Sequence, residues 1–284
     1  MPQEAPVRDS PHPPQTGRAA PPRASLSMFE SAWIWLAVAV LVLAWLPLLA
    51  AIRVFDRDPV RYRTGRWFRR LGATITRVNP AWDLHIQGAQ QITDPRRPYV
   101  IVSNHQSMAD IPLLSHLPWE MKWVAKLELF RLPVVGWMMR MAGDIPVNRT
   151  NARSGARAMI TAAHYLDQHC SVMFFPEGTR SRDGRIGAFN DGAFHLAARQ
   201  GVLILPIAVD GSHDCLPKKS WRFGGRSEIR VKVLPPIQPG GPGKTEATRL
   251  RDEARASIVQ QLAQWRGVPA ADVDALASRQ EIRP

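Results

Sequence analysis

A histidine and an aspartate five residues apart form the pair in this sequence that is best suited to moving a proton. His105 and Asp110 lie in the segment YVIVSNHQSMAD, residues 99–110. An imidazole that is oriented by a carboxylate can remove the proton of a hydroxyl group. With 8 histidines and 15 aspartates in 284 residues, this spacing arises by chance about 0.4 times, so the pair alone is weak evidence.

Two other segments carry side chains that suit an anionic substrate. In FPEGTRS, residues 175–181, proline and glycine favour a tight turn, whose free backbone N–H groups and Arg180 can hold a phosphate. GDIPVNR, residues 143–149, is a second glycine-containing segment that ends in an arginine, and Lys126 is a third candidate cation. The alternative interpretation of each segment is a solvated turn or an ordinary surface charge.

Short apolar runs alternate with helical patterns from about residue 82 onward and must position these side chains. Residues 99–103 and 171–175 are predicted buried strands that lead directly into the His105 turn and into FPEGTRS. Further strands are predicted at an edge near Leu84 and Ile86 and over 202–209 and 229–234, and helices over 110–117, 134–142, 151–169, 188–200 and 246–266. This alternation predicts an α/β fold with a mixed central sheet flanked by helices.

The N-terminal part of the chain has a different character. Residues 1–27 are rich in proline, arginine, alanine and serine and are predicted to form a disordered tail, unless the true start codon lies downstream. Residues 32–52 contain no charged side chain and as a helix would reach roughly 31 Å, enough to span a hydrocarbon core. A membrane anchor is favoured over a buried helix or a signal peptide. The anchor can span the bilayer, or it can pair with residues 53–78 and insert into one leaflet. The sequence leaves both arrangements open, and we favour attachment to one leaflet.

Basic residues follow this apolar run directly. They are interleaved with apolar side chains, which predicts a basic amphipathic helix on anionic lipid at the cytoplasmic face of the inner membrane. The net charge of +13 would also suit binding to nucleic acid. The sequence contains no nucleic-acid-binding motif, however, so nucleic acid is not expected as a partner. The residues concerned are Arg53, Arg57, Arg61, Arg63, Arg66, Arg69 and Arg70.

Other catalytic classes find little support in the sequence. The two cysteines, Cys170 and Cys215, have no metal-binding spacing and are interpreted as small buried residues. HExxH and GxSxG are absent, so neither a metal site nor a nucleophilic serine is predicted, and Ser107 is assigned to local hydrogen bonding. No cofactor is expected.

Taken together, the ordered segments resemble the lysophospholipid acyltransferase family, the PlsC-like 1-acylglycerol-3-phosphate acyltransferases. NHQSMAD resembles the family's NHx4D block, GDIPVNR the second block, FPEGTRS the third and LPIAV, residues 205–209, the fourth. The resemblance covers roughly residues 82–235. Asn148 departs from it, because the second block often has an acidic residue before its arginine.

The resemblance implies roles for specific residues. His105 would be the general base and Asp110 the carboxylate that orients it. The acceptor phosphate would be bound by Lys126, Arg149 and Arg180. Glu177, Gly178 and Thr179 would contact the substrate, the first two by positioning the glycerol.

By the same resemblance we expect transfer of an acyl chain from acyl-CoA or an acyl-carrier protein to the sn-2 hydroxyl of 1-acylglycerol-3-phosphate. The product would be phosphatidic acid, and the partners a thioester donor, a lysophospholipid acceptor and membrane lipid. The alternatives are another acceptor, such as lyso-ornithine lipid, and a non-catalytic lipid-binding protein. The predicted organisation is a tail (1–27), an anchor with its basic helix (28–80) and a catalytic domain (81–284).

Overall fold

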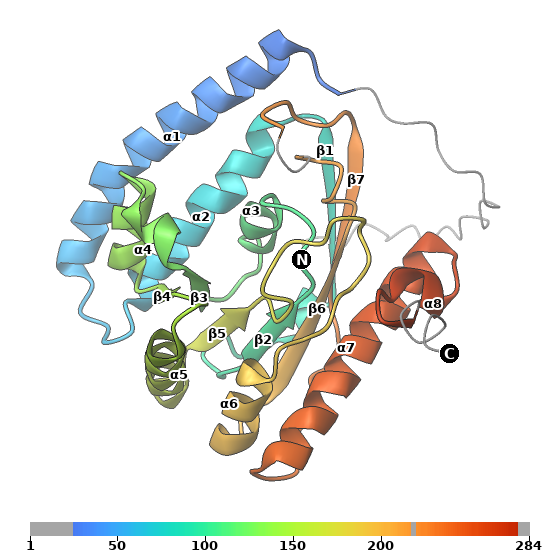
Figure 1. The fold of residues 1–284 in the computed structure, drawn as a ribbon. Coiled ribbons are helices and arrows are strands. Elements are labelled where there is room, and N and C mark those ends of the chain that lie inside the picture. The colour runs from blue at the N-terminus through green and yellow to red at the C-terminus, as the bar shows by residue number, and fades with distance from the viewer. Residues whose placement is uncertain (1–24, 217–219, 278–284) are drawn as a thin grey trace, which may run out of the picture.

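The computed structural model of the protein describes residues 25–216 and 220–277 (Figure 1). The predicted tail lies outside the described residues up to position 24. The strands are β1 (Trp82–Gln87), β2 (Val100–Ser103), β3 (Met121–Lys126), β4 (Ile145–Val147), β5 (Ser171–Phe174), β6 (Ile204–Asp210) and β7 (Ser227–Val233). The helices are α1 (Met28–Phe55), α2 (Tyr62–Val78), α3 (Asp110–Leu114), α4 (Val135–Ala142), α5 (Ala152–Asp167), α6 (Gly192–Gln200), α7 (Lys244–Arg266) and α8 (Ala270–Val273). Short 3-10 turns lie at η1 (Ala89–Gln91) and η2 (Leu127–Arg131).

The described strands form one mixed sheet in the order β1-β7-β6-β2-β5-β3-β4, so the predicted fold class is confirmed. Strands β6, β2, β5, β3 and β4 run parallel to one another, whereas β7 runs antiparallel to β6 and parallel to β1. The parallel strands therefore end at a common edge. Ligands of α/β proteins commonly bind at such an edge, near the point where the strand order reverses.

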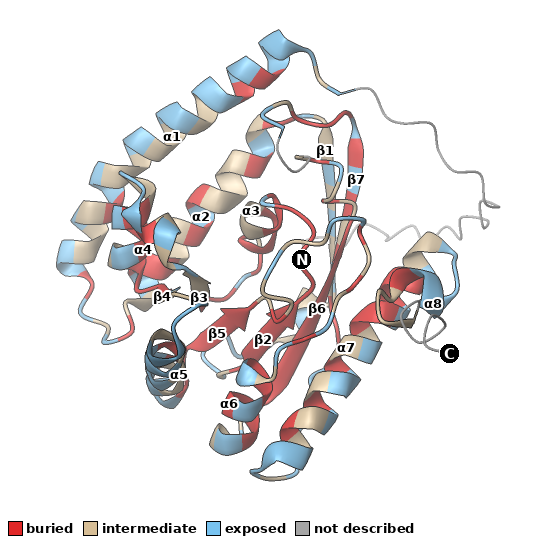
Figure 2. Ribbon diagram, viewed as in Figure 1, coloured by how far each residue is buried: buried red, intermediate tan, exposed pale blue. Residues whose placement is uncertain are grey.

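Helices cover both faces of the sheet (Figure 1). On one face α5, α6 and α7 pack against alternate strand residues such as Val100, Val172 and Ile204. On the other face α3 and the segment that follows it pack against Ile101, Met173 and Leu205. The central strands β2, β5 and β6 are buried along their whole length (Figure 2), as expected of strands covered on both sides.

Helix α1 contains the predicted apolar anchor and is, in the part of the chain that the structure describes, the helix long and apolar enough to cross a membrane. It begins with a capping box, in which the Ser27 hydroxyl accepts from the Glu30 N–H and the Glu30 carboxylate accepts from the Ser27 N–H. Its exposed residues include large apolar ones, for example Phe29 (89%) and Trp33 (69%). Figure 2 colours much of the helix as exposed. An apolar surface of this kind indicates contact with lipid or protein.

Helix α1 contacts the rest of the protein towards both of its ends. Near its beginning, the Trp35 indole donates to the Trp221 carbonyl at 2.7 Å, and the Leu26 N–H donates to the Phe223 carbonyl at 3.0 Å. Near its end, Leu49 packs with residues of α2 and α4. The helix therefore lies along the side of the domain (Figure 1).

In the predicted basic segment Arg69 is buried and Arg66 is partly buried, so these two side chains do not lie at the headgroups, where the prediction placed the basic groups. Arg66 donates to the carbonyls of Leu117 and Trp119. Arg69 is buried and forms an ion pair with Asp144. The remaining members of the set, such as Arg63 and Arg70, are exposed or partly exposed.

The buried ion pair of Arg69 belongs to a larger cluster of charges under α2. Glu120 lies 3.0 Å from the Lys122 ammonium and 3.8 Å from the Arg69 guanidinium. Lys122 also donates to the Ala142 carbonyl, and Asp144 accepts from the Trp123 N–H. Two cations therefore neutralise two carboxylates among α2, β3 and β4. Burial raises the pKa of Glu120, opposed by the two cations.

Candidate active site

The predicted proton-transfer pair is in hydrogen-bond contact at the end of β2. The His105 Nδ1 lies 2.7 Å from the Asp110 Oδ2. The imidazole is stacked on the Phe175 ring, with 4.0 Å between the centroids, and its side chain keeps 11% of its surface exposed. Among the described residues its Nε2 makes no hydrogen bond. The contact with Asp110 selects the tautomer with the proton on Nδ1, which leaves Nε2 as a proton acceptor.

Asp110 is fully buried at the beginning of α3 and is surrounded by donors. Its Oδ2 also accepts from the backbone N–H groups of Gln106 (2.7 Å) and Ser107 (2.9 Å). Its Oδ1 accepts from the hydroxyl of Ser212, which follows β6. Hydrogen bonds from these groups compensate the loss of solvation of the buried carboxylate and fix its orientation.

Asn104 joins the turn that carries His105 to the neighbouring strand. Its side-chain Nδ2 donates to the Val209 carbonyl at 2.8 Å, and its Oδ1 accepts from the Val209 N–H at 2.9 Å. The backbone register between β2 and β6 ends with Ser103 opposite Ile207. The amide of Asn104 thus prolongs the β2–β6 pairing by side-chain contacts and places the next residue, His105, at the sheet edge.

The FPEGTRS turn follows β5 and contacts the histidine segment from the other side. The carboxylate of Glu177 accepts from the His105 N–H (2.8 Å) and from the Gly187 N–H (2.9 Å). The Ser181 N–H donates to the His105 carbonyl at 2.8 Å. Burial raises the pKa of Glu177, and the two backbone hydrogen bonds oppose that change. The structure therefore gives Glu177 a contact with the His105 backbone that the sequence did not predict.

The predicted phosphate-binding cations lie at the ends of adjacent strands. Arg149 follows β4, and its guanidinium donates to the Gly178 carbonyl, so it reaches the FPEGTRS turn. Lys126 ends β3 opposite Val147 of β4, is exposed, and lies 3.4 Å from Glu128. Arg180 has no hydrogen bond or ion pair among the described residues and is half-buried.

The turn itself is shaped by glycine. Gly178 has a φ of +71°, the left-handed conformation that glycine adopts without strain, and its N–H donates to the Phe175 carbonyl. Thr179 lies exposed at its tip. The structure thus brings Arg149 to the FPEGTRS turn. It gives no direct contact between Lys126 and Arg180.

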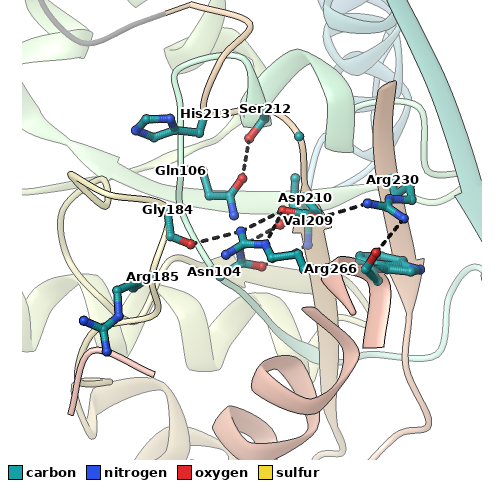
Figure 3. Close-up of polar contacts among 12 residues, drawn as sticks. Asn104, Gln106, Gly184, Arg185, Val209, Asp210, Ser212, His213, Arg230 and Arg266 are labelled. Atoms are coloured by element: carbon teal, nitrogen blue, oxygen red, sulfur yellow. Dashed lines mark hydrogen bonds and ion pairs between the residues drawn. The ribbon is translucent and has the colours of Figure 1, made fainter. Parts of the chain in front are cut away.

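A second cluster of polar side chains holds the end of β6 in place (Figure 3). Asp210 accepts from Arg266 of α7 at 2.7 Å and lies 3.5 Å from Arg230 of β7. Arg266 also donates to the Gly184 carbonyl at 3.0 Å, in the loop that follows FPEGTRS. The C-terminal helix therefore holds β6 and this loop together beside the site.

Sequence reasoning missed Asn104, Ser212 and Asp210 as contributors to the site. Asn104 stood next to the predicted histidine and followed a strand, which is a usable signal for a side chain that prolongs strand pairing. Ser212 lies 102 residues from Asp110 in the chain, and no local pattern links the two.

Comparison with known proteins agrees with this geometry. Residues 83–210 match the family model described as Acyltransferase. This segment of the chain is an acyltransferase-family domain. The match contains the dyad, both predicted arginines and all of FPEGTRS, so the resemblance seen in the sequence is confirmed.

Two curated proteins illustrate how far the likeness extends. A chloroplast 1-acyl-sn-glycerol-3-phosphate acyltransferase of Arabidopsis thaliana is 35% identical over 205 residues, which are 72% of this chain and 56% of the relative. A 1-acyl-sn-glycerol-3-phosphate acyltransferase of Pseudomonas aeruginosa is 27% identical over 84% of this chain and 88% of the relative. The chain thus spans little more than half of the plant relative's length.

A solved structure shares the fold. The crystal structure of the 1-acyl-sn-glycerophosphate acyltransferase PlsC from Thermotoga maritima aligns with a TM-score of 0.69 and 24% identity, over 83% of this chain and 96% of that one. At this identity the likeness concerns the arrangement of the acyltransferase domain.

Proposed function

We propose that this protein transfers an acyl chain from an acyl thioester to the free sn-2 hydroxyl of 1-acylglycerol-3-phosphate, giving phosphatidic acid for phospholipid synthesis. The observation that carries the proposal is the His105–Asp110 pair, whose unoccupied Nε2 lies at the sheet edge next to the turn that Arg149 contacts. The names of the relatives support the same reaction.

The chemistry proceeds by direct transfer. His105 Nε2 removes the proton of the acceptor hydroxyl, and the oxygen attacks the thioester carbonyl carbon. The tetrahedral intermediate collapses with cleavage of the carbon–sulfur bond, and the imidazolium returns the proton to the departing thiolate. Asp110 keeps the imidazole in the required tautomer and stabilises its protonated form. No group of the enzyme is acylated.

The acceptor is proposed to bind through its phosphate and glycerol. Arg149, which donates to the Gly178 carbonyl, and Arg180, two residues after Gly178 in the chain, supply guanidinium groups, and Lys126 adds a third positive charge from β3. Burial lowers the pKa of Arg149, but an arginine stays protonated at neutral pH. Glu177 and Gly178 are proposed to position the glycerol, Glu177 through its hydrogen bond with the His105 backbone, and Thr179 is proposed to contact the substrate.

The membrane arrangement is proposed to be attachment to one leaflet, at the cytoplasmic face of the inner membrane. Contacts of α1 with the domain near both of its ends support a helix that lies along the bilayer surface. The exposed apolar side chains of α1 and the arginines of the following segment would then meet acyl chains and headgroups. This places the acceptor hydroxyl, which belongs to a membrane lipid, within reach of the site.

The experiment is an acceptor and donor panel with the purified full chain in vesicles. Lysophosphatidic acid and lyso-ornithine lipid are supplied with an acyl-CoA or an acyl-carrier protein, and products are identified by mass spectrometry. We expect phosphatidic acid from lysophosphatidic acid. If only lyso-ornithine lipid were acylated, it would be the acceptor in place of lysophosphatidic acid. Lipid binding without thioester consumption would contradict the proposal.

Two pairs of variants test the assigned roles. His105→Ala should abolish turnover while His195→Ala, an exposed histidine of α6, should not. Arg149→Ala should raise KM for lysophosphatidic acid about 10–100-fold, as expected for loss of a charge-assisted hydrogen bond. Arg157→Ala, which removes an exposed charge from α5, should leave KM unchanged. Wild-type turnover by a folded His105→Ala variant would refute the assignment of His105 as the general base.

A further inference from the structure

We propose that Ser212 is a third member of the proton-transfer system, a positioning residue that holds Asp110 in the orientation needed by His105. The inference rests on the proposed function, because it concerns the same reaction. It goes beyond the family motifs, since Ser212 lies after the fourth block and outside the matched residues 83–210.

The Ser212 hydroxyl is directed at the one carboxylate oxygen that His105 does not use. Asp110 Oδ2 is occupied by His105 and by two backbone N–H groups, while Oδ1 receives the hydroxyl of Ser212. Both residues are fully buried, at 0% exposure. The hydroxyl therefore fixes the rotation of the carboxylate about its Cβ–Cγ bond, and that rotation decides where Oδ2 points.

The hydroxyl has a choice between two acceptors, and the geometry favours Asp110. The other acceptor is the Gln106 Oε1 at 3.4 Å (Figure 3), a longer contact to a neutral group. A hydroxyl has a single proton to donate, and a carboxylate attracts it more strongly than an amide oxygen. Gln106 is thereby left as a weaker neighbour, and its buried Nε2 has no partner among the described residues.

The backbone around Ser212 is held in place, so its hydroxyl stays next to the Asp110 carboxylate. Gly211 before it has a φ of +81°, and a Cβ there would lie 2.1 Å from the Glu228 carbonyl oxygen, so only glycine fits. Asp210 is held by Arg266 and Arg230. The segment 210–212 is thus anchored to α7 and β7 (Figure 3), and it carries that rigidity to the Asp110 carboxylate.

The experiment compares Ser212→Ala, Ser212→Thr and a matched control in the acyl-transfer assay. For Ser212→Ala we expect kcat to fall about 10–100-fold, the loss of one hydrogen bond to a charged group, with KM for both substrates unchanged. Ser212→Thr keeps the hydroxyl and should recover part of the activity. Ser227→Ala removes another buried serine hydroxyl, which donates to the Gly225 carbonyl, and should leave kcat unchanged.

A double-mutant cycle separates positioning from general loss of structure. If Ser212 acts through Asp110, adding Ser212→Ala to Asp110→Ala should reduce kcat by less than twofold, because the partner is already gone. Equal losses in both backgrounds, or wild-type kcat in folded Ser212→Ala, would overturn the inference. Absence of acyl transfer by the wild-type chain would instead count against the proposed function itself.

Discussion

The hydrogen bonds of Asn104 predict that its replacement by alanine damages both folding and turnover. Asn104 occupies both polar groups of the Val209 backbone, and Val209 is fully buried. In Asn104→Ala the N–H and the C=O of Val209 lose their partners in a place that water enters poorly. The change also releases the segment that carries His105.

The magnitude follows from these two groups. A buried polar group without a partner costs about 1–3 kcal/mol, so two groups cost about 4 kcal/mol of unfolding free energy. For a domain of this size each kcal/mol lowers the melting temperature by about 2–4 °C, which gives a decrease of about 8–16 °C. Displacement of a catalytic group by about 1 Å lowers the rate by about 100-fold, and a loss of that order is expected in kcat.

Thermal unfolding in detergent followed by circular dichroism measures the first effect, and acyl transfer well below the melting temperature measures the second. Asn151→Ala is the control, because it removes an amide that caps α5 through the Ser154 N–H and should cost about 1 kcal/mol. Asn104→Asp keeps an acceptor for the Val209 N–H but turns an oxygen towards its carbonyl. Acidification, which protonates that carboxyl, should restore a donor and part of the stability. A melting temperature for Asn104→Ala within 2 °C of wild type, together with wild-type kcat, would refute the reasoning.

Three further predictions concern other parts of the molecule. Asp110→Asn removes the charge that stabilises the protonated imidazole, so kcat should fall about 10³–10⁴-fold, and unchanged kcat would argue against the dyad. The melting temperature should change little, because the amide keeps an oxygen for the N–H groups of Gln106 and Ser107. Burial raises the pKa of Cys170 to about 12, so a maleimide at pH 8 should modify this thiol only after unfolding, as mass spectrometry of the labelled protein would show. Arg255 lowers the pKa of Asp274 below its ordinary value of 3.8, so the ion pair stabilises the fold fully above pH 3.8 and loses its effect as the pH falls through the folded-state pKa. The stability difference between wild type and Asp274→Asn, measured by chemical unfolding, should therefore shrink below pH 3.8, and a difference independent of pH would exclude this origin.

The parts of the fold that were predicted are those whose pattern is local. β2, β5 and β6 are short apolar runs bounded by turns, and α5 and α7 have apolar residues at helical spacing. Helix α6 begins at Gly192, whereas the sequence predicted a start at residue 188. The residues before Gly192 contact the FPEGTRS turn instead, since the Asn190 side chain donates to the Pro176 carbonyl.

Strands β3 and β4 were missed for different physical reasons. β3 carries Lys122 at a fully buried position, which is compatible with a strand only because Glu120 and the Ala142 carbonyl compensate its charge. β4 has three residues, one of them Pro146, and is too short to show alternation. The burial of Arg69 was likewise not predictable, because its charge is compensated by Asp144, which is distant in the chain.

Within the site, the dyad and the segment FPEGTRS were predictable because each lies within a few residues. Their convergence was not, since it depends on which strands are neighbours in the sheet. The order β2-β5-β3-β4 brings His105, Glu177, Lys126 and Arg149 to one edge. The roles assigned to these residues in binding the acceptor stay predictions until the variants are measured.

The cluster of Arg69, Asp144, Glu120 and Lys122 bears on how this protein can be produced. A common way to obtain a soluble enzyme is to delete the apolar segment, and the predicted boundary between residues 80 and 81 invites such a truncation. That deletion would remove Arg69 together with the whole of α2, so Glu120 and Asp144 would lose that cation and apolar side chains that pack on α2, such as Met138, would be uncovered. The shortened chain should therefore aggregate. Purification of the full chain in detergent or nanodiscs, with solubilising substitutions confined to the exposed face of α1, is the better strategy.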